Sequence, residues 1–177
     1  MSIKRIVILV ITLVLAGFSA VHLSAYSAKL TPSTSLARET LGGVSLQDNI
    51  NDSQLLKLYG SPLSEEDNEH FDYRHWKDGL VTASVHSGPK QGSIKRIMIT
   101  AADMDHSADP LHTVMGIGLG DSKQSVLDLY GEKYYKSNEQ TADIIGYIDH
   151  KRGVTLEFWC SPDGTVAEIR LDDAEMR

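Results

Sequence analysis

The sequence predicts an α+β protein built from two tandem α-β-β-β repeats, with short helices packed on antiparallel sheet. The first observation is a repeated segment: Leu55 to Gly60 (LLKLYG) returns as Val126 to Gly131 (VLDLYG), 71 positions later. The second is that the alternating apolar pattern of strands follows each segment, at an offset of 72 or 73 positions. A nearly constant offset across helix and strands favours duplication over coincidence.

The two short helices are predicted from their apolar spacing and from their ends. In each copy, apolar residues stand at i, i+3 and i+4, and a glycine follows where a helix favours a left-handed residue. The first helix is expected to end at Tyr59, with Asp48 or Asp52 as its N-cap. The second is expected from about Ser122 to Tyr130, with Asp121 as its cap.

Three strands are predicted after each helix. They are expected at residues 71–76, 80–86 and 94–100 in the first repeat, and at 143–149, 154–160 and 165–171 in the second. On the strand 80–86, the small apolar residues Val81, Ala83 and Val85 are expected to face the core. A three-stranded sheet with one short helix buries little apolar surface, so the two repeats are expected to join their sheets or share a core.

The repeats divide the chain into six segments. Polar stretches at 64–69 and 132–140 are expected to be loops within the repeats. The predicted segments are a signal peptide or N-terminal membrane anchor (1–28), a spacer (29–39), the first repeat (40–100), an acidic linker (101–114), the second repeat (115–171) and a polar tail (172–177).

The first 28 residues predict export. Lys4 and Arg5 precede an apolar run from Ile6 to Ala16, and small residues follow up to Ala28, as in cleaved signal peptides. Without cleavage, the weakly apolar stretch up to Leu23 would serve as a membrane anchor. The protein is therefore expected to be extracytoplasmic, secreted or attached to the membrane through this segment alone.

Charge and cysteine content narrow the classes of partner. The formal net charge is −7, whereas nucleic acids and anionic lipid head groups require positive faces, so neither is expected as a partner. Cys160 is the only cysteine and cannot form an internal disulfide, and no cysteine follows the signal segment for acylation. Because Cys160 shares a strand face with Leu156 and Phe158, a buried and inert thiol is expected.

The strand face opposite the predicted core carries the candidate binding residues. Aromatic and arginine side chains on an otherwise polar face are the usual anchors of protein interfaces. The alignment of the repeats places His86 and Trp159 at equivalent positions. The predicted partner-binding residues are Trp159, His86, Trp76, Arg74 and Arg170, with the arginines directed toward an acidic patch of the partner. The alternative is that the tryptophans pack beneath the helices or a loop.

The alternative function is that of an accessory domain that binds a small ligand or metal through the central linker. A metal site needs rigidly held ligands, which an aperiodic linker does not offer, so neither metal nor cofactor is expected. Because the sequence shows no Ser-His-Asp or paired-carboxylate signature, the protein is expected not to be an enzyme, although a hydrolase site assembled in space stays a third hypothesis. The linker residues with ligand chemistry are Asp103, Asp105, His106, Asp109 and His112.

Residues 118–131 (GLGDSKQSVLDLYG) resemble the helix-start motif of a family group that includes the β-lactamase inhibitory protein and the SmpA/OmlA (BamE-like) envelope proteins. Residues 46–60 resemble it more loosely, and the tandem arrangement over roughly residues 42–171 is similar to that of the inhibitory protein. The chain lacks the paired cysteines of the inhibitory protein and the acylated cysteine of the envelope lipoproteins. The resemblance implies a non-catalytic module that binds another protein across its sheet.

Overall fold

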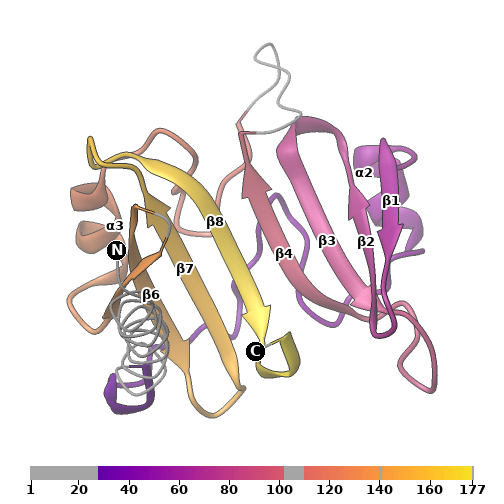
Figure 1. Ribbon diagram of the computed structural model, residues 1–177, viewed down its shortest axis with the longest axis horizontal. Coiled ribbons are helices and arrows are strands. Elements are labelled where there is room, and N and C mark those ends of the chain that lie inside the picture. The colour runs from indigo at the N-terminus through magenta and orange to yellow at the C-terminus, as the bar shows by residue number, and fades with distance from the viewer. Residues whose placement is uncertain (1–27, 102–109, 140, 177) are drawn as a thin grey trace, which may run out of the picture.

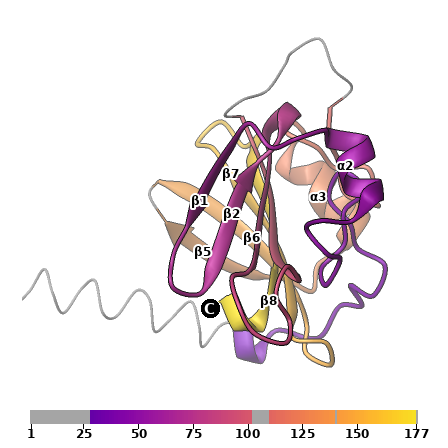
Figure 2. The same cartoon turned by 90° about the vertical axis from the view of Figure 1, so that its right-hand side faces the viewer.

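The computed structural model describes residues 28–101, 110–139 and 141–176. These residues form one eight-stranded antiparallel sheet with α2 and α3 on one side (Figures 1 and 2), which confirms the predicted α+β class. The strand order is β1-β2-β3-β4-β8-β7-β6-β5, so the halves join at β4 and β8. In chain order the elements are α2 (Ser53–Tyr59), β1 (Ser64–Asp67), β2 (Phe71–His75), η1 (Lys77–Gly79), β3 (Leu80–Val85), β4 (Ile94–Thr100), α3 (Lys123–Tyr130), β5 (Tyr135–Glu139), β6 (Ala142–Asp149), β7 (Val154–Cys160), β8 (Val166–Asp173) and η2 (Ala174–Met176).

The register at the centre of the sheet relates the two halves. Met98 of β4 lies opposite Arg170 of β8, and on either side of this pair an isoleucine of β4 faces an apolar residue of β8. These flanking pairs are Ile97 with Leu171 and Ile99 with Ile169. Met98 and Arg170 are 72 positions apart, as expected from the offset of the predicted repeats, and in each half one helix precedes four strands.

Each half has one strand more than the three predicted. The stretches 64–69 and 132–140, expected to be loops, contain β1 and β5, which form the two edges of the sheet. All four residues of β1 are exposed, and β5 buries Tyr135 alone. An edge strand with both faces largely in water needs no apolar alternation, so periodicity does not reveal it.

The core lies between the helices and one face of the sheet. That face carries Leu80 of β3, which reverses the prediction that Val81, Ala83 and Val85 face the core. The neighbouring Thr82 can lie on the core face because its hydroxyl accepts a hydrogen bond from the indole nitrogen of Trp76 at 2.9 Å. The sheet residues of the core are Leu80, Ile94, Ile97, Ile99, Ile145, Tyr147, Leu156, Phe158, Cys160, Val166, Ile169 and Leu171.

Both helices end as predicted, and one begins differently. Asp52 caps α2 by accepting a hydrogen bond from the Gln54 amide at 2.7 Å. For α3 the cap is Ser122, and the predicted cap Asp121 instead accepts from the Gly118 amide at 2.8 Å, in the preceding turn. Within the described ranges of the chain, no helix is long and apolar enough to cross a membrane.

The predicted spacer packs against the folded body. Leu36 is part of the core, and its amide donates to the Asp149 carboxylate at 3.1 Å. The Thr34 amide also donates to the Ile148 carbonyl at 2.8 Å. The boundary near residue 40 was therefore placed too late, because one buried leucine in a polar stretch produces no periodic signal. The export segment at 1–27 and the linker residues 102–109 lie outside the described residues.

The predicted polar tail is also ordered. β8 continues to Asp173, and η2 follows directly. Lys95, only 1% exposed, holds this end of the chain: its ammonium lies 3.2 Å from the Asp173 carboxylate and 2.9 Å from that of Glu175. A contact to a residue 78 positions earlier cannot be read from the tail itself.

Candidate functional site

The sheet face that α2 and α3 leave uncovered is called the helix-free face (Figure 2). It is defined by three rows of cross-strand neighbours, since directly paired residues point to the same side of a sheet. The first row runs Tyr135, Gly146, Glu157, Arg170, Met98, Val81, His75 and Ser64. The second runs Ile148, Thr155, Asp172, Arg96, Ala83, Tyr73 and Glu66, and the third Ser137, Ile144, Trp159, Glu168 and Thr100.

A bidentate ion pair crosses the centre of this face. The Arg96 guanidinium donates through Nε and Nη2 to the two oxygens of Asp172, each at 2.7 Å. Both side chains are largely buried, and paired arginine and carboxylate groups with this geometry are among the stronger ion pairs in proteins. The pair joins β4 to β8, and so connects the two halves through side chains as well as backbone.

Trp159 belongs to a second cluster, and the row of Glu157 and Arg170 lies between its row and that of Asp172. The Arg170 guanidinium lies 3.8 Å from the centre of the indole ring and also forms an ion pair with Glu168. The indole nitrogen of Trp159 donates to one oxygen of Glu157 at 3.1 Å, and the Tyr135 hydroxyl donates to the other oxygen. Trp159 is consequently only 8% exposed, with its ring held between charged neighbours.

Glycine allows Tyr135 to take part in this cluster. A Cβ atom on Gly146 would lie 2.0 Å from the Tyr135 ring, so the ring covers the bare backbone of the neighbouring strand. Tyr135 belongs to a stretch expected to be a loop, and sequence reasoning missed it. The alternation of Tyr135, Ser137 and Glu139 was the only signal, and it is a weak one.

The five predicted partner-binding residues do not share one surface. Trp159 and Arg170 meet on the helix-free face, as expected. Trp76 is fully buried in the core, so a partner cannot reach it. Arg74 lies on the helix side of β2, where its guanidinium donates to Asn51 at 3.2 Å and approaches Glu65.

His86 follows the end of β3 and does not correspond to Trp159. In the register, Trp159 faces Glu168 of β8 as Ala83 faces Arg96 of β4, so Ala83 is the residue at the matching position. The His86 ring lies 2.5 Å from the Asp72 carboxylate, and this hydrogen bond raises the pKa of the imidazole. His86 therefore forms an ion pair with Asp72 of β2 and does not belong to the cluster around Trp159.

The other chemistry-bearing groups behave as isolated residues. Cys160 is buried in the core, as predicted, and burial raises the pKa of its thiol. Among residues 28–101, 110–139 and 141–176, no three His, Cys, Asp or Glu side chains lie where they could hold a metal ion. The linker candidates Asp103, Asp105, His106 and Asp109 fall outside the described residues, while His112 is described and exposed.

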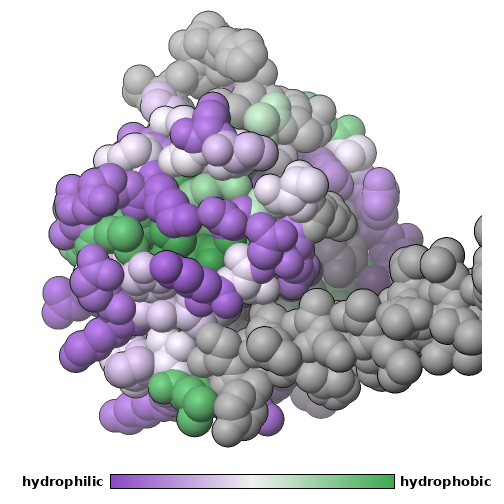
Figure 3. Space-filling model, turned by 60° about the vertical axis from the view of Figure 1, so that its left-hand side comes forward, coloured by the Kyte–Doolittle hydropathy of each residue, from purple (hydrophilic) through white to green (hydrophobic). Residues whose placement is uncertain are grey.

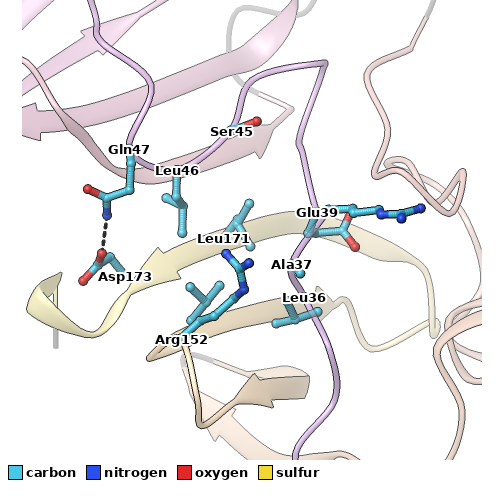
Figure 4. A pocket seen from close by; sticks show the side chains of 11 residues that line it. Leu36, Ala37, Glu39, Ser45, Leu46, Gln47, Arg152, Leu171 and Asp173 are labelled. Carbon is cyan, nitrogen blue, oxygen red and sulfur yellow. Dashed lines mark hydrogen bonds between the residues drawn. The ribbon is translucent and has the colours of Figure 1, made fainter.

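Among the hollows away from the helix-free face are two that combine apolar lining with charged groups. Figure 3 shows hydrophobic surface among hydrophilic residues on the side that carries α3. Val114, Met115 and Leu129 are exposed and line a groove of about 380 Å³. A pocket of about 250 Å³ lies where residues 36–39 and 45–47 meet β8. In Figure 4 the Arg152 side chain projects among the residues that line this pocket, and a hydrogen bond from Gln47 to Asp173 lies at its rim.

Comparison with known proteins gives only distant similarities. No protein-family model matches the sequence, and no curated protein matches it. A solved DUF4309 family protein from Bacillus subtilis is 15% identical, with a TM-score of 0.43 over 88% of this chain and 96% of that chain. A solved extracellular protein containing an SCP domain, from Bacillus anthracis, is 10% identical, with a TM-score of 0.41 over 76% of this chain and 48% of that chain. Neither similarity is close enough to support a statement about fold or function.

Proposed function

We propose that the chain is an extracytoplasmic, non-enzymatic protein that binds another protein across the helix-free face of its sheet. The proposal rests on the cluster of Trp159, Arg170, Glu168 and Glu157 at the middle of a face that neither α2 nor α3 covers. Tryptophan and arginine are enriched among the residues that contribute most to protein interfaces. The resemblance of residues 118–131 to the inhibitory-protein and BamE-like group supports the same function.

The binding proposal is tested with two arginine variants on opposite sides of the sheet. The full chain is immobilised and exposed to envelope and secreted proteins, beside Arg170→Ala and Arg74→Ala. Arg170→Ala is expected to lose the bound protein, because it removes the guanidinium stacked on Trp159. Arg74→Ala is expected to retain it, because Arg74 lies on the helix side. Equal capture by three folded proteins, checked by circular dichroism, would contradict the proposal.

The extracytoplasmic location is supported by the basic and apolar pattern of residues 1–28. The full chain is expected in the envelope or medium of the native host, and a chain without residues 1–28 in the cytoplasm. Immunoblots of the cell fractions measure this. Detection of the full chain in the cytoplasm alone would argue against export.

We also propose that the two halves are tandem copies of one α-β-β-β-β unit. The matching element order, and the β-bulges at matching positions of the β3–β4 and β7–β8 pairs, support a duplication. A chain made of two joined copies of residues 112–176 is then expected to fold into the same eight-stranded sheet. Circular dichroism and cooperative urea unfolding test this, and an aggregated or non-cooperative product would count against duplication.

Binding of a small ligand is a second candidate function, favoured by the pocket around Arg152. The pocket combines this exposed guanidinium with a floor that includes Leu36, Leu46 and Leu171, which suits a small carboxylate with an apolar part. Hexanoate is expected to raise the melting temperature of the full chain but not of Arg152→Gln. A parallel series with Zn²⁺ and the variants Asp105→Ala and His106→Ala tests the linker. If hexanoate raised the melting temperature of Arg152→Gln by the same amount, this pocket would not be its binding site.

A further inference from the structure

The helix-free face carries an excess of negative charge. Four carboxylates and two guanidinium groups of the three rows point to this side of the sheet, and Glu139 joins them because it continues the alternation of Tyr135 and Ser137 along β5. They are Glu66, Glu139, Glu157, Glu168 and Asp172 against Arg96 and Arg170. His75 is the remaining titratable group with a possible positive charge on these rows. The face is therefore acidic overall, in line with the net charge of −7 of the whole chain.

Neither arginine is available to an acidic partner. Arg96 makes two hydrogen bonds of 2.7 Å to Asp172, and Arg170 is paired with Glu168 while its plane covers Trp159. A partner carboxylate would have to displace an intramolecular carboxylate that is already in place. The sequence-based expectation of an acidic patch on the partner rested on Arg74 and Arg170. Arg74 lies on the helix side and Arg170 is paired with Glu168, so neither supports that expectation.

Glu157 keeps capacity for a donor from outside. Its two oxygens accept one hydrogen bond each, from Tyr135 and Trp159, while a carboxylate has about four acceptor sites. It is only half-buried, and Glu168 beside it retains 24% of its side-chain exposure. An ammonium or guanidinium group arriving at this point would meet two carboxylates on an aromatic base.

The other half of the face has a different character. The rows there continue into Met98, Val81 and Ala83, with Tyr73 and Phe71 on β2. Met98, Tyr73 and Phe71 are partly exposed, so this region offers apolar and aromatic contact next to the acidic region. A segment that crosses the strands would place apolar side chains on one region and cations on the other.

We infer that the helix-free face binds a basic protein segment, with lysine or arginine side chains at Glu157 and Glu168 and apolar side chains over Met98 and Tyr73. This inference rests on the proposed binding function and names its partner by charge. Electrostatic complementarity of this kind directs association and excludes acidic competitors.

The inference is tested with two labelled peptides and the full chain. One peptide alternates lysine and leucine, and the other has glutamate in place of each lysine. Fluorescence anisotropy is expected to show binding of the lysine peptide alone. Glu157→Gln combined with Glu168→Gln is expected to weaken it by about tenfold, as ion pairs to two half-buried carboxylates are lost.

The matched control removes the same charge from elsewhere in the chain. Glu69→Gln combined with Glu132→Gln changes two exposed glutamates outside the three rows and is expected to leave the affinity within about twofold. An equal loss in this control would mean non-specific attraction and would overturn the inference, as would absence of binding by the lysine peptide. Tighter binding of the glutamate peptide, lost in Arg170→Ala, would overturn the basic partner while leaving the proposed binding face intact.

Discussion

The two halves of the sheet place different side chains at matching positions of the helix-free face. Beside the centre, Val81 and Met98 face each other in the first half, where Glu157 and Arg170 do so in the second. One step along, Ala83 faces Arg96 where Trp159 faces Glu168. Because the backbone pairing is the same, the difference lies in the side chains alone. The same backbone pairing thus presents an apolar region in the first half and a charged region in the second, side by side on one face.

The largest expected effect separates the two tryptophans, one from each half. Trp76→Ala should destabilise the protein by about 3–5 kcal/mol, because it empties a fully buried site and removes the donor to Thr82. Trp159→Ala should cost about 2 kcal/mol, because its ring packs against Arg170 at the surface of the sheet. Urea unfolding of the full chain measures both. Equal losses would show that the helix-free face is part of the structural core.

The second prediction concerns the glycine found only in the second half. Gly146→Ala should destabilise the protein by about 1–3 kcal/mol, because the new methyl group would meet the Tyr135 ring. In the first half His75 stands at the position that matches Gly146, and Ser64 at the position that matches Tyr135. The edge strand there carries no aromatic ring that would have to be accommodated. The substitution should cost clearly less in a Tyr135→Leu background, a coupling that a double-mutant cycle of unfolding free energies detects. A cost independent of residue 135 would refute the packing argument.

A third prediction uses the β-bulge that both halves contain. Lys95 is the unpaired residue between β3 and β4, and Ala167 is its counterpart between β7 and β8. Lys95→Met should destabilise by about 1–2 kcal/mol, because it leaves Asp173 without its cation and Glu175 with Lys90 alone. Ala167→Lys should change stability by less than about 0.5 kcal/mol, since this position is exposed. Thermal melting of both variants measures this difference in stability. An equal change in melting temperature would contradict the prediction.

The smallest effect is the pH dependence that Glu39 contributes through its contact with the end of α3. Tyr59 at the end of α2 donates to the Gly42 carbonyl, whereas Tyr130 at the end of α3 donates to the Glu39 carboxylate at 3.1 Å. Burial raises the pKa of Glu39 despite its hydrogen bonds from Val114 and Tyr130. The folded protein therefore holds this proton more tightly than the unfolded chain, and the associated stability is lost as pH rises through the raised pKa.

Urea unfolding between about pH 4 and 7 tests this sign. The native protein should lose stability relative to Glu39→Gln as pH rises, by less than about 1 kcal/mol. Tyr59→Phe should show no such relative change, because its partner is a neutral carbonyl. A relative gain of stability with rising pH would mean that the hydrogen bonds to Glu39 outweigh its burial.

Strands and helix ends were predictable where the local pattern was strong. The strands at 94–100 and 154–160 were predicted to the residue, as were the helix ends at Gly60 and Gly131. The edge strands were missed because their polar residues face water on both sides. Alternation within one strand shows which residues share a face, and it leaves open which face meets the helices.

The candidate site was predicted in part for the same reason. Trp159 and Arg170 were placed on the helix-free face, whereas Trp76, Arg74 and His86 were expected beside them and lie elsewhere. The repeat alignment used an offset of 73 positions in this strand, while the register between Ala83 and Trp159 gives 76. An odd error in register moves a side chain to the other face, so an unequal hairpin length was enough to misplace His86.

By itself the sequence determined the α+β class, the ends of both helices and the buried Cys160, because turns and pleats repeat over a few residues and leave a local pattern. The tertiary structure alone decided the joining of β4 to β8, the edge strands and the face that meets the helices. It also decided the pairing of Arg96 with Asp172, which are 76 positions apart. Such contacts depend on how distant segments close on one another, and no local periodicity encodes that closure.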